Sequence, residues 1–145
     1  MFISVTRLRI RSIRYLLPFF LHNERVVKQT VQAPGYFGGS LFVDKRWTFW
    51  TLTTWESKSA MLAYRNADAH KAAMPKLQRW CDEASVAHWE QEDGAPVPAW
   101  PEAHRRMLEE GRKSRVRKPS ADHEAGRIAA PRWPNKVVRP LPPRC

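Results

Sequence analysis

The sequence predicts an α+β domain in which strands and helices follow one another in the order βαββαβ. Three observations support this prediction. Short β-branched and aromatic stretches alternate with segments of helical periodicity, one of these stretches is apolar on both sides, and the composition changes after residue 93. A length of 145 residues favours a single domain. We therefore expect residues 1–93 to form the folded unit and residues 94–145 to form a tail.

Each element has a local signal. The second and third strands are joined at Asp44 as a hairpin. The first helix carries Pro18 in its first turn, where no hydrogen-bonded N–H is lost, and it stops at Pro34. Ser57 can cap the second helix, and Pro75 is expected to kink or restart the third. In chain order, we expect strands over residues 2–9, 36–44, 46–56 and 84–91, and helices over residues 18–33, 56–66 and 68–82.

The third strand has aromatic side chains on both faces. Strand side chains alternate between the two faces of a sheet. One face therefore carries Trp47, Phe49, Thr51, Thr53 and Trp55, and the other carries Trp50 and Leu52. A strand that is apolar on both faces needs two covers. We expect helices to cover one face and a second copy of the chain to cover the other, which predicts a homodimer through the sheet faces.

Basic residues and prolines are concentrated in the last third of the chain. Lys and Arg outnumber Asp and Glu by 13 to 9 in residues 1–93 and by 12 to 5 in residues 94–145, which also hold 9 of the 12 prolines. Such a segment buries too little apolar surface to offset the entropy of ordering it. We expect a disordered basic tail with one short helix over residues 101–110, and non-specific contacts between the tail and nucleic acid phosphates.

The sequence argues against several settings and chemistries. Cys81 and Cys145 are too few for a disulfide framework, so we expect a reducing cytoplasm. The apolar run from Ile13 to Leu21 is too short for a membrane span, and no membrane partner is expected. The motifs HExxH, CxxC, GxSxG and GxxxxGK[ST] are absent, which argues against hydrolases and kinases. The segment Gly35-Tyr-Phe-Gly-Gly39 is too short for a dinucleotide fingerprint and precedes a strand, which argues against a Rossmann dehydrogenase. Gly38 and Gly39 instead suggest a bulge or a close backbone approach in the second strand.

Four short segments carry a resemblance to a known family. They are Ala33-Pro-Gly-Tyr-Phe-Gly-Gly39, Phe49-Trp-Thr-Leu-Thr-Thr-Trp55, Met61-Leu-Ala-Tyr-Arg65 and Ala69-His-Lys-Ala-Ala-Met74. Together with the element order, they resemble the antibiotic-biosynthesis-monooxygenase superfamily of dimeric α/β barrels, with similarity to its spheroidene-monooxygenase-like branch. The resemblance covers about residues 1–92. It implies a ferredoxin-like fold, a homodimer, and a pocket between the sheet and the helices.

His70 is the first candidate for chemistry. With Met74, Leu77 and Cys81 it falls on one largely apolar face of the third helix. An imidazole at that place could act as a general base or, if haem binds, as the iron ligand. The alternative is a structural histidine that is hydrogen-bonded to a neighbour.

The aromatic and cationic candidates surround the same expected pocket. Trp50 and Trp55 could wall a cavity for an aromatic substrate, and burial in the core or the dimer interface is the alternative. Arg65 could anchor a carboxylate or a haem propionate, or form a surface ion pair. We expect Tyr64, Met74 and His88 to complete the ligand-binding set with Arg65.

Three functions remain open from the sequence. The first is a monooxygenase-like protein whose apolar pocket takes an aromatic or polyene substrate, with no cofactor or with haem. The second is a non-catalytic homodimer that binds a hydrophobic ligand or haem. The third is nucleic-acid binding, since RNA-recognition modules share the split βαβ order. The segment Gly35-Tyr-Phe-Gly-Gly39 lacks the basic residue and the aromatic spacing of their RNA-binding motif.

Overall fold

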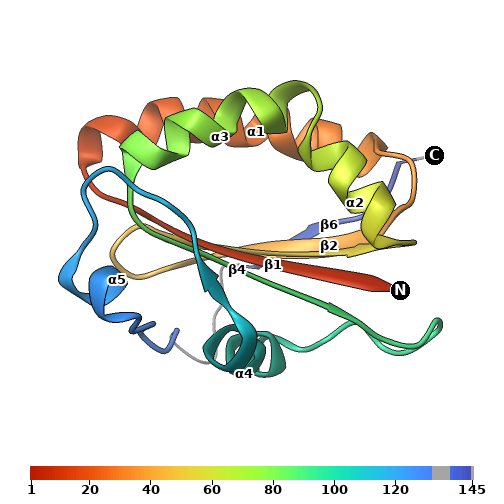
Figure 1. The fold of residues 1–145 in the computed structure, drawn as a ribbon. Helices are drawn as coiled ribbons and strands as arrows, with labels where there is room; N and C mark the ends of the chain where they lie inside the picture. Colours follow the sequence, from red (N-terminus) through yellow and green to blue (C-terminus); the bar gives the residue numbers. More distant parts are fainter. Residues whose placement is uncertain (132–137, 145) are drawn as a thin grey trace.

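A computed structural model describes residues 1–131 and 138–144. Residues 132–137 of the predicted tail and Cys145 lie outside the described part. Six strands form one sheet in the order β5-β4-β1-β3-β2-β6. The strands are β1 (Phe2–Ile10), β2 (Tyr36–Asp44), β3 (Thr48–Trp55), β4 (Cys81–Glu90), β5 (Arg112–Lys113) and β6 (Val138–Leu141), and the helices are α1 (Leu16–Gln32), α2 (Lys58–Arg65), α3 (Asp68–Trp80), α4 (Trp100–Glu110) and α5 (Ala121–Ala125). Figure 1 shows α1, α2 and α3 on one face of the sheet and α4 on the other.

The predicted βαββαβ order is confirmed. A short 3₁₀ turn over Ile13–Tyr15 precedes α1, so Pro18 lies in the first turn of the helix as expected. The Ser57 side chain caps α2 by accepting a hydrogen bond from the backbone N–H of Ala60. Helix α3 continues through Pro75 without a break, contrary to the predicted restart. Helix α3 lies beside α1 over the sheet, and its contacts with α1 and β4 hold it in place despite the missing donor at Pro75.

The β2–β3 pairing contains the predicted irregularity. The register shifts between Tyr36 and Gly38, which is where a bulge was expected. At the next position, a Cβ on Gly39 would lie 2.1 Å from the carbonyl oxygen of Leu52, so only glycine fits there. This close approach lets β2 stay in register with β3 up to Asp44, and it keeps the sheet continuous below the helices.

Helix α4 covers the face that the sequence assigns to a second copy of the chain. Ala103 and Met107 of α4 are fully buried in one cluster with Trp50. The remaining buried members of this cluster are Ile3, Val5, Phe42, Leu52, Ala87 and Trp89. The two-sided burial of β3 is therefore confirmed, but its second cover comes from the same chain. In this structure the sheet face is not open to a partner subunit.

The region predicted as a disordered tail contributes four elements to the fold. The predicted helix at residues 101–110 is confirmed as α4. Strand β5 extends the sheet beside β4, and β6 extends it beside β2. Leu141 of β6 is buried against α1 and β3, and its carbonyl accepts a hydrogen bond of 2.6 Å from the Tyr36 hydroxyl. Composition does not predict that this region is ordered. Only a few of its residues are apolar, and they are buried because the sheet offers apolar surface for them to pack against.

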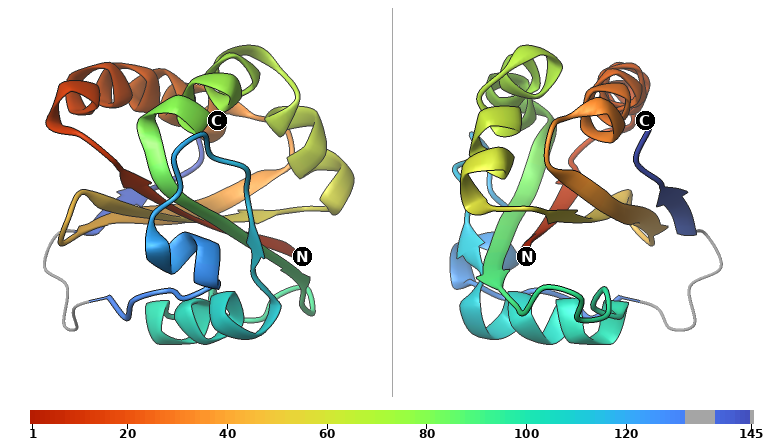
Figure 2. Two further views of the ribbon diagram at one scale, coloured as in Figure 1. Left: turned by 60° about the vertical axis from the view of Figure 1, so that its left-hand side comes forward. Right: turned by 90° about the vertical axis from the view of Figure 1, so that its right-hand side faces the viewer.

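Residues 112–117 form a strap that runs from the β4 edge toward α3, as Figures 1 and 2 show. The Ser114 N–H donates to the Ala84 carbonyl at 2.8 Å, and the Arg117 N–H donates to the Gln78 carbonyl at 2.9 Å. The strap therefore bridges the sheet and α3 along one side of the molecule. Among residues 1–131 and 138–144, no helix has both the length and the hydropathy that a membrane span requires.

Candidate ligand cavity

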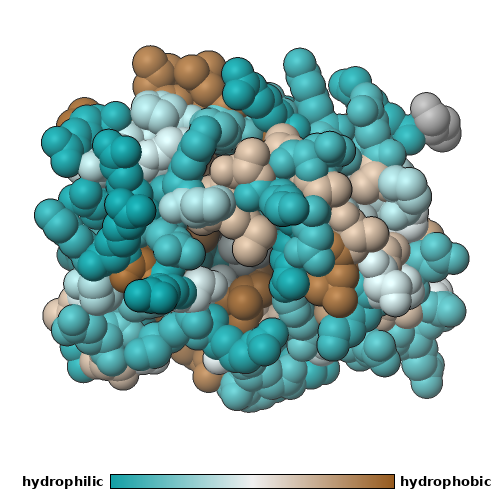
Figure 3. All heavy atoms as spheres, turned by 45° about the horizontal axis from the view of Figure 1, so that its top comes forward, coloured by the Kyte–Doolittle hydropathy of each residue, from teal (hydrophilic) through white to brown (hydrophobic). Residues whose placement is uncertain are grey.

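A cavity of about 410 Å³ lies between the sheet and helices α1, α2 and α3. Its size falls in the usual range for small-molecule sites. Apolar side chains form most of its helical wall: Phe19, Val26, Val27, Met61, Ala73, Met74 and Leu77. Figure 3 views this side of the molecule and shows apolar side chains near its middle among hydrophilic ones. The predicted pocket between sheet and helices is therefore present in the structure.

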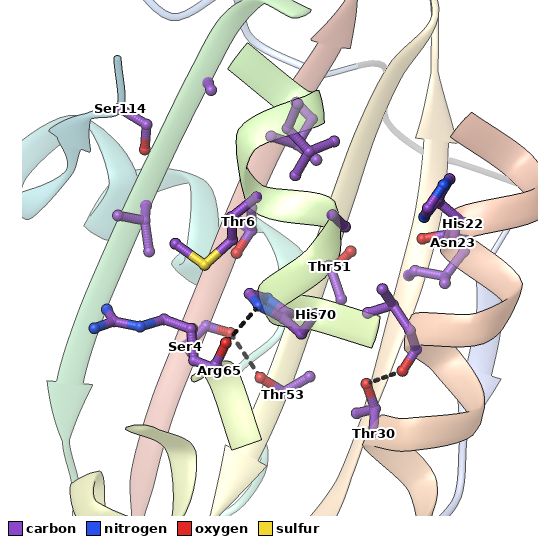
Figure 4. Close-up of a pocket in the computed structure, with 18 of the residues that line it drawn as sticks. Ser4, Thr6, His22, Asn23, Thr30, Thr51, Thr53, Arg65, His70 and Ser114 are labelled. Carbon is purple, nitrogen blue, oxygen red and sulfur yellow. Dashed lines mark hydrogen bonds between the residues drawn. The ribbon is translucent and has the colours of Figure 1, made fainter. Parts of the chain in front are cut away.

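Four hydroxyl groups form the floor of the cavity. Ser4 and Thr6 come from β1 and lie directly opposite Thr53 and Thr51 of β3. Cross-strand partners point to the same face of a sheet, so the register gathers these side chains beneath the helices (Figure 4). Thr53 accepts a hydrogen bond of 2.9 Å from the Trp55 indole. The other three hydroxyls make no hydrogen bond to any described residue, so they are available to a ligand.

His70 lies above this floor, and its environment defines its tautomer. Its ring Nδ1 is 3.1 Å from the Arg65 carbonyl oxygen, which can only accept, so Nδ1 carries the proton (Figure 4). The backbone N–H of His70 donates to the side chain of Gln29 at 2.8 Å, which holds the first turn of α3 against α1. Burial lowers the pKa of His70. The neutral ring therefore has an unprotonated Nε2, which can accept a proton.

Two further histidines line the cavity. His22 accepts a hydrogen bond of 3.0 Å from the Lys76 ammonium through Nε2, and burial followed by the charge of Lys76 lowers its pKa. His88 of β4 lies opposite Ser4, and its pKa is lowered first by burial and then by the charge of Arg112. The cavity thus presents neutral imidazoles at pH 7.

Tyr64 lies at the end of the cavity beside α2, and Trp55 packs behind it. The Thr30 hydroxyl donates to the Val26 carbonyl, so the Tyr64 hydroxyl must be the donor in its 2.7 Å contact with Thr30. Burial raises the pKa of Tyr64 to about 12, which keeps the phenol protonated. Trp55 is fully buried and stacks on Tyr64 at 4.8 Å between ring centroids. Trp55 therefore supports a wall residue and does not itself line the cavity.

Trp50 does not belong to this site. It is 1% exposed, lies on the α4 face, and packs against Phe42 and the ring of His104. The hypothesis that Trp50 walls the substrate cavity is wrong, because alternation along β3 directs it to the opposite side of the sheet from Thr51. The other predicted ligand-binding residues, Tyr64, Arg65, Met74 and His88, all line the cavity together with His70.

The sequence analysis missed two groups of lining residues. The floor hydroxyls could have been found from alternation, because Thr51 and Thr53 share a face with Trp55. The strap residues could not, because nothing in a basic, proline-rich segment predicts where it will pack. The strap contributes Arg112, Ser114, Arg115 and Val116, and β6 contributes Leu141.

The donor set for a metal is small. Among the described residues, no group of three or more His, Cys, Asp or Glu side chains could hold a metal ion. Haem needs a single protein nitrogen, and Nε2 of His70 meets that requirement, because the bond from Nδ1 to the Arg65 carbonyl orients the ring. Among the histidines that line the cavity, only His70 has both features: its Nδ1 contacts the Arg65 backbone carbonyl, and its ring lies directly above the floor hydroxyls.

The chain forms a ferredoxin-like α+β fold with a cavity under its helices. Residues 21–76 match the family model of antibiotic biosynthesis monooxygenases. This match agrees with the resemblance seen in the sequence at the level of the family. The matched segment includes His70, Tyr64, Arg65 and Met74, and it ends before His88 and the strap. The similarity to the spheroidene-monooxygenase-like branch stays a prediction.

Solved structures share this fold at low sequence identity. An antibiotic biosynthesis monooxygenase superposes with a TM-score of 0.57 and 16% identity, over 63% of this chain and 99% of that one. Rv0793 from Mycobacterium tuberculosis gives 0.58 and 11%, over 66% and 98%. A mutant of SnoaB, a cofactor-independent oxygenase from Streptomyces nogalater, gives 0.54 and 12%, over 66% and 96%. A search of curated proteins found no significant match. These neighbours are matched over almost their whole length. About a third of this chain has no counterpart in them.

Proposed function

We propose that the protein is a monooxygenase that oxidises an electron-rich aromatic or polyene substrate inside the cavity under α1 and α3. The observation that carries this proposal is the cavity itself. Its walls are mostly apolar, its floor offers unpaired hydroxyls, and the neutral imidazole of His70 lies above that floor. The family match and the shared fold support the same chemistry. An apolar site of this kind excludes water from a reactive substrate anion.

His70 is the residue that we assign to proton transfer. In the proposed reaction, Nε2 of His70 takes a proton from an acidic C–H of the substrate, and the resulting carbanion is oxidised by dioxygen. For a methylene between aromatic rings the balance is R₂CH₂ + O₂ → R₂C=O + H₂O. The substrate supplies all four electrons, so dioxygen is the only other reactant.

The floor hydroxyls orient the substrate. Ser4, Thr6 and Thr51 lie in one patch beneath His70 and have hydrogen-bonding capacity to spare. A substrate with ring oxygens would pair with them, whereas a pure hydrocarbon would leave three buried or half-buried hydroxyls unpaired. The unpaired hydroxyls therefore favour an aromatic substrate with ring oxygens over a polyene.

The experiment compares His70→Gln with His104→Gln in an oxygen-consumption assay. Anthrone is a suitable probe because its central methylene is acidic and its quinone product absorbs visible light. We expect His70→Gln to lower kcat about 100-fold, the lower end of general-base effects. His104 lies on α4 at the other face of the sheet, so its variant should keep wild-type turnover. Wild-type turnover in His70→Gln would remove His70 from the mechanism.

An absorption spectrum with added haem separates the cofactor-free from the haem-linked form of this proposal. A Soret shift that saturates at one haem per chain and is lost in His70→Ala would make His70 an iron ligand. No specific haem binding, with anthrone turnover intact, would leave dioxygen as the sole oxidant. Stoichiometric binding of anthrone without turnover would instead support the non-catalytic ligand-binding alternative.

A further inference from the structure

We propose that the natural ligand of the cavity carries a carboxylate, which Arg65 from α2 and Arg112 from the strap hold at the β4 edge. This inference rests on the proposed function, because it places the anionic end of the same aromatic ligand. It also assigns a role to the strap, which belongs to the C-terminal region beyond the predicted 1–93 unit. The argument depends on the position of the strap, on the balance of charge in the cavity, and on the register of β5.

The strap closes the side of the cavity between β4 and α3. Its backbone is fixed at both ends by hydrogen bonds, to Ala84 on the sheet and to Gln78 on α3, and both of these residues line the cavity. Figure 2 shows the strap running past β4 toward α3, and Figure 4 shows Ser114 at the same edge beyond β4. A ligand that fills the cavity must therefore end against strap side chains on this side.

The charge of the cavity is unbalanced. Arg65, Arg112 and Arg115 are among its lining residues, and no Asp or Glu is among the described residues that line it. Arg112 and Arg115 make no ion pair with any described residue, and Arg65 has only a 3.5 Å contact with the Asn66 side chain. Arg65 is half-buried, whereas Arg112 and Arg115 are exposed at the edge of the cavity. Guanidinium groups that line a cavity without an acidic partner favour an anionic ligand, and their planar donor fork suits a carboxylate.

Several arginines outside the cavity have acidic partners. Arg7, which is buried on the opposite face, donates to Glu83 at 2.9 Å, and Arg9 forms a two-bond contact with Asp82. On the exposed surface of α4, Arg105 and Arg106 pair with glutamates one helical turn away. Other arginines, such as Arg25 and Arg46, also form no ion pair with a described residue, but they do not line the cavity. What distinguishes Arg65 and Arg112 is therefore that both line the cavity, where no acidic residue is among the described lining residues.

The register of β5 directs Arg112 and Lys113 to opposite sides. Arg112 pairs with Val86, which lines the cavity, and Lys113 pairs with Ser85, which lines a separate hollow on the α4 side. Arg112 borders both spaces, whereas Lys113 borders only the α4-side hollow. Cross-strand partners share a face. His88, two residues along β4 from Val86, lies within reach of both Arg112 and Arg65, and the charges of these two arginines help to lower its pKa. Arg65, Arg112 and His88 all line the cavity, and Figure 4 shows the Arg65 side chain extending toward β4.

The test uses 2-naphthoate and 2-naphthamide, which share a flat ring system and differ in charge. Calorimetric titration of the full chain should show the carboxylate binding at least about 10-fold more tightly than the amide, the value of one good charge-assisted hydrogen bond. Arg112→Gln should remove most of this preference and leave the amide unchanged. Lys113→Gln is the matched control, since it removes the same charge from the next residue on the other face, and it should keep the preference.

Each other outcome has a distinct meaning. Equal binding of both compounds to the wild type overturns the carboxylate inference and leaves the proposed aromatic site intact. Equal losses in Arg112→Gln and Lys113→Gln also overturn it, because general surface charge would then explain the preference. Binding of neither compound contradicts the aromatic cavity itself. Because both side chains are exposed, an unchanged thermal midpoint in each variant is expected and confirms that folding is intact.

Discussion

The two faces of the sheet are built from alternate residues of the same strands, yet one face is filled and the other is hollow. On the α4 face, Trp50 and Leu52 interdigitate with Ala103 and Met107, and all four are at most 1% exposed. On the face under α1 and α3, the neighbouring Thr51 takes part in the floor of a cavity. Alternation along one strand therefore separates the residues that stabilise the fold from those that meet a ligand.

This separation explains how the hollow face is tolerated. Densely packed apolar groups on the α4 face supply stability, so the cavity face can leave hydroxyls unpaired and hold cations without acidic partners. Arginines also differ between the two faces in whether they have an acidic partner. Arg7 is neutralised by Glu83 on the filled face, whereas Arg65 and Arg112 are left open on the hollow one. The filled face acts as a rigid backing for the binding face.

The largest expected effect comes from breaking the filled face. Met107→Asp places an unpaired carboxylate between α4 and the sheet, and we expect a loss of about 4 kcal/mol in the free energy of unfolding, as for other uncompensated buried charges. Separation of α4 would expose the sheet around Trp50, so the variant should also self-associate. Urea unfolding and light scattering after size-exclusion chromatography measure the two effects.

Leu108→Asp is the matched control for Met107→Asp. Leu108 is the next residue on α4 and is 56% exposed, so the same new charge should change the free energy of unfolding by less than about 0.5 kcal/mol. Similar values for the two variants would show that α4 does not cover the sheet in solution. The second-copy cover predicted from the sequence would then become the better description of this face.

The sequence was sufficient for the strands and helices of residues 1–93 because each has a local signal. The Ser57 cap, the bulge at Gly38 and the alternation along β3 depend on neighbours in the chain, and the structure confirms all three. His70 and Met74 could be placed on one helix face in the same way. The position of Trp50 relative to the site could also have been deduced, since alternation already separated it from Thr51.

The C-terminal residues could not be predicted because their order depends on partners far away in sequence. Ala103 and Met107 look unremarkable in a charged helix, and they become core residues only because the sheet offers an apolar face. Arg112 is one of many basic residues, and its place in the cavity follows from pairing with Val86. Composition describes how much apolar surface a segment has but not where that surface finds its complement.

The histidines of the hollow face give the second expected effect, a loss of stability in mild acid. The pKa values of His22, His70 and His88 are lowered mainly by burial. A lowered pKa means that the folded state binds fewer protons than the unfolded state, so this stability is complete above the ordinary histidine pKa of about 6.5 and is lost as the pH falls below it. Urea unfolding at pH 7.5 and at pH 5.5 should show this decrease. His70→Gln should flatten the dependence, and an unchanged slope would mean that the His70 ring is not buried.

The smallest expected effect on stability lies at the cavity floor. It is measured by making the same Thr→Val substitution on each face of β3. Thr51→Val removes a hydroxyl that has no protein partner, so the free energy of unfolding should change by less than about 0.5 kcal/mol. Thr54→Val removes a buried hydroxyl that donates to the Gly38 carbonyl at 2.8 Å, and it should cost about 1 to 3 kcal/mol. Ligand binding should respond in the opposite way. Thr51→Val should weaken 2-naphthol several-fold relative to naphthalene, while Thr54→Val leaves their ratio unchanged. If both variants left that ratio unchanged, the floor hydroxyls would not contact the ligand, and the difference between the two faces would be one of packing alone.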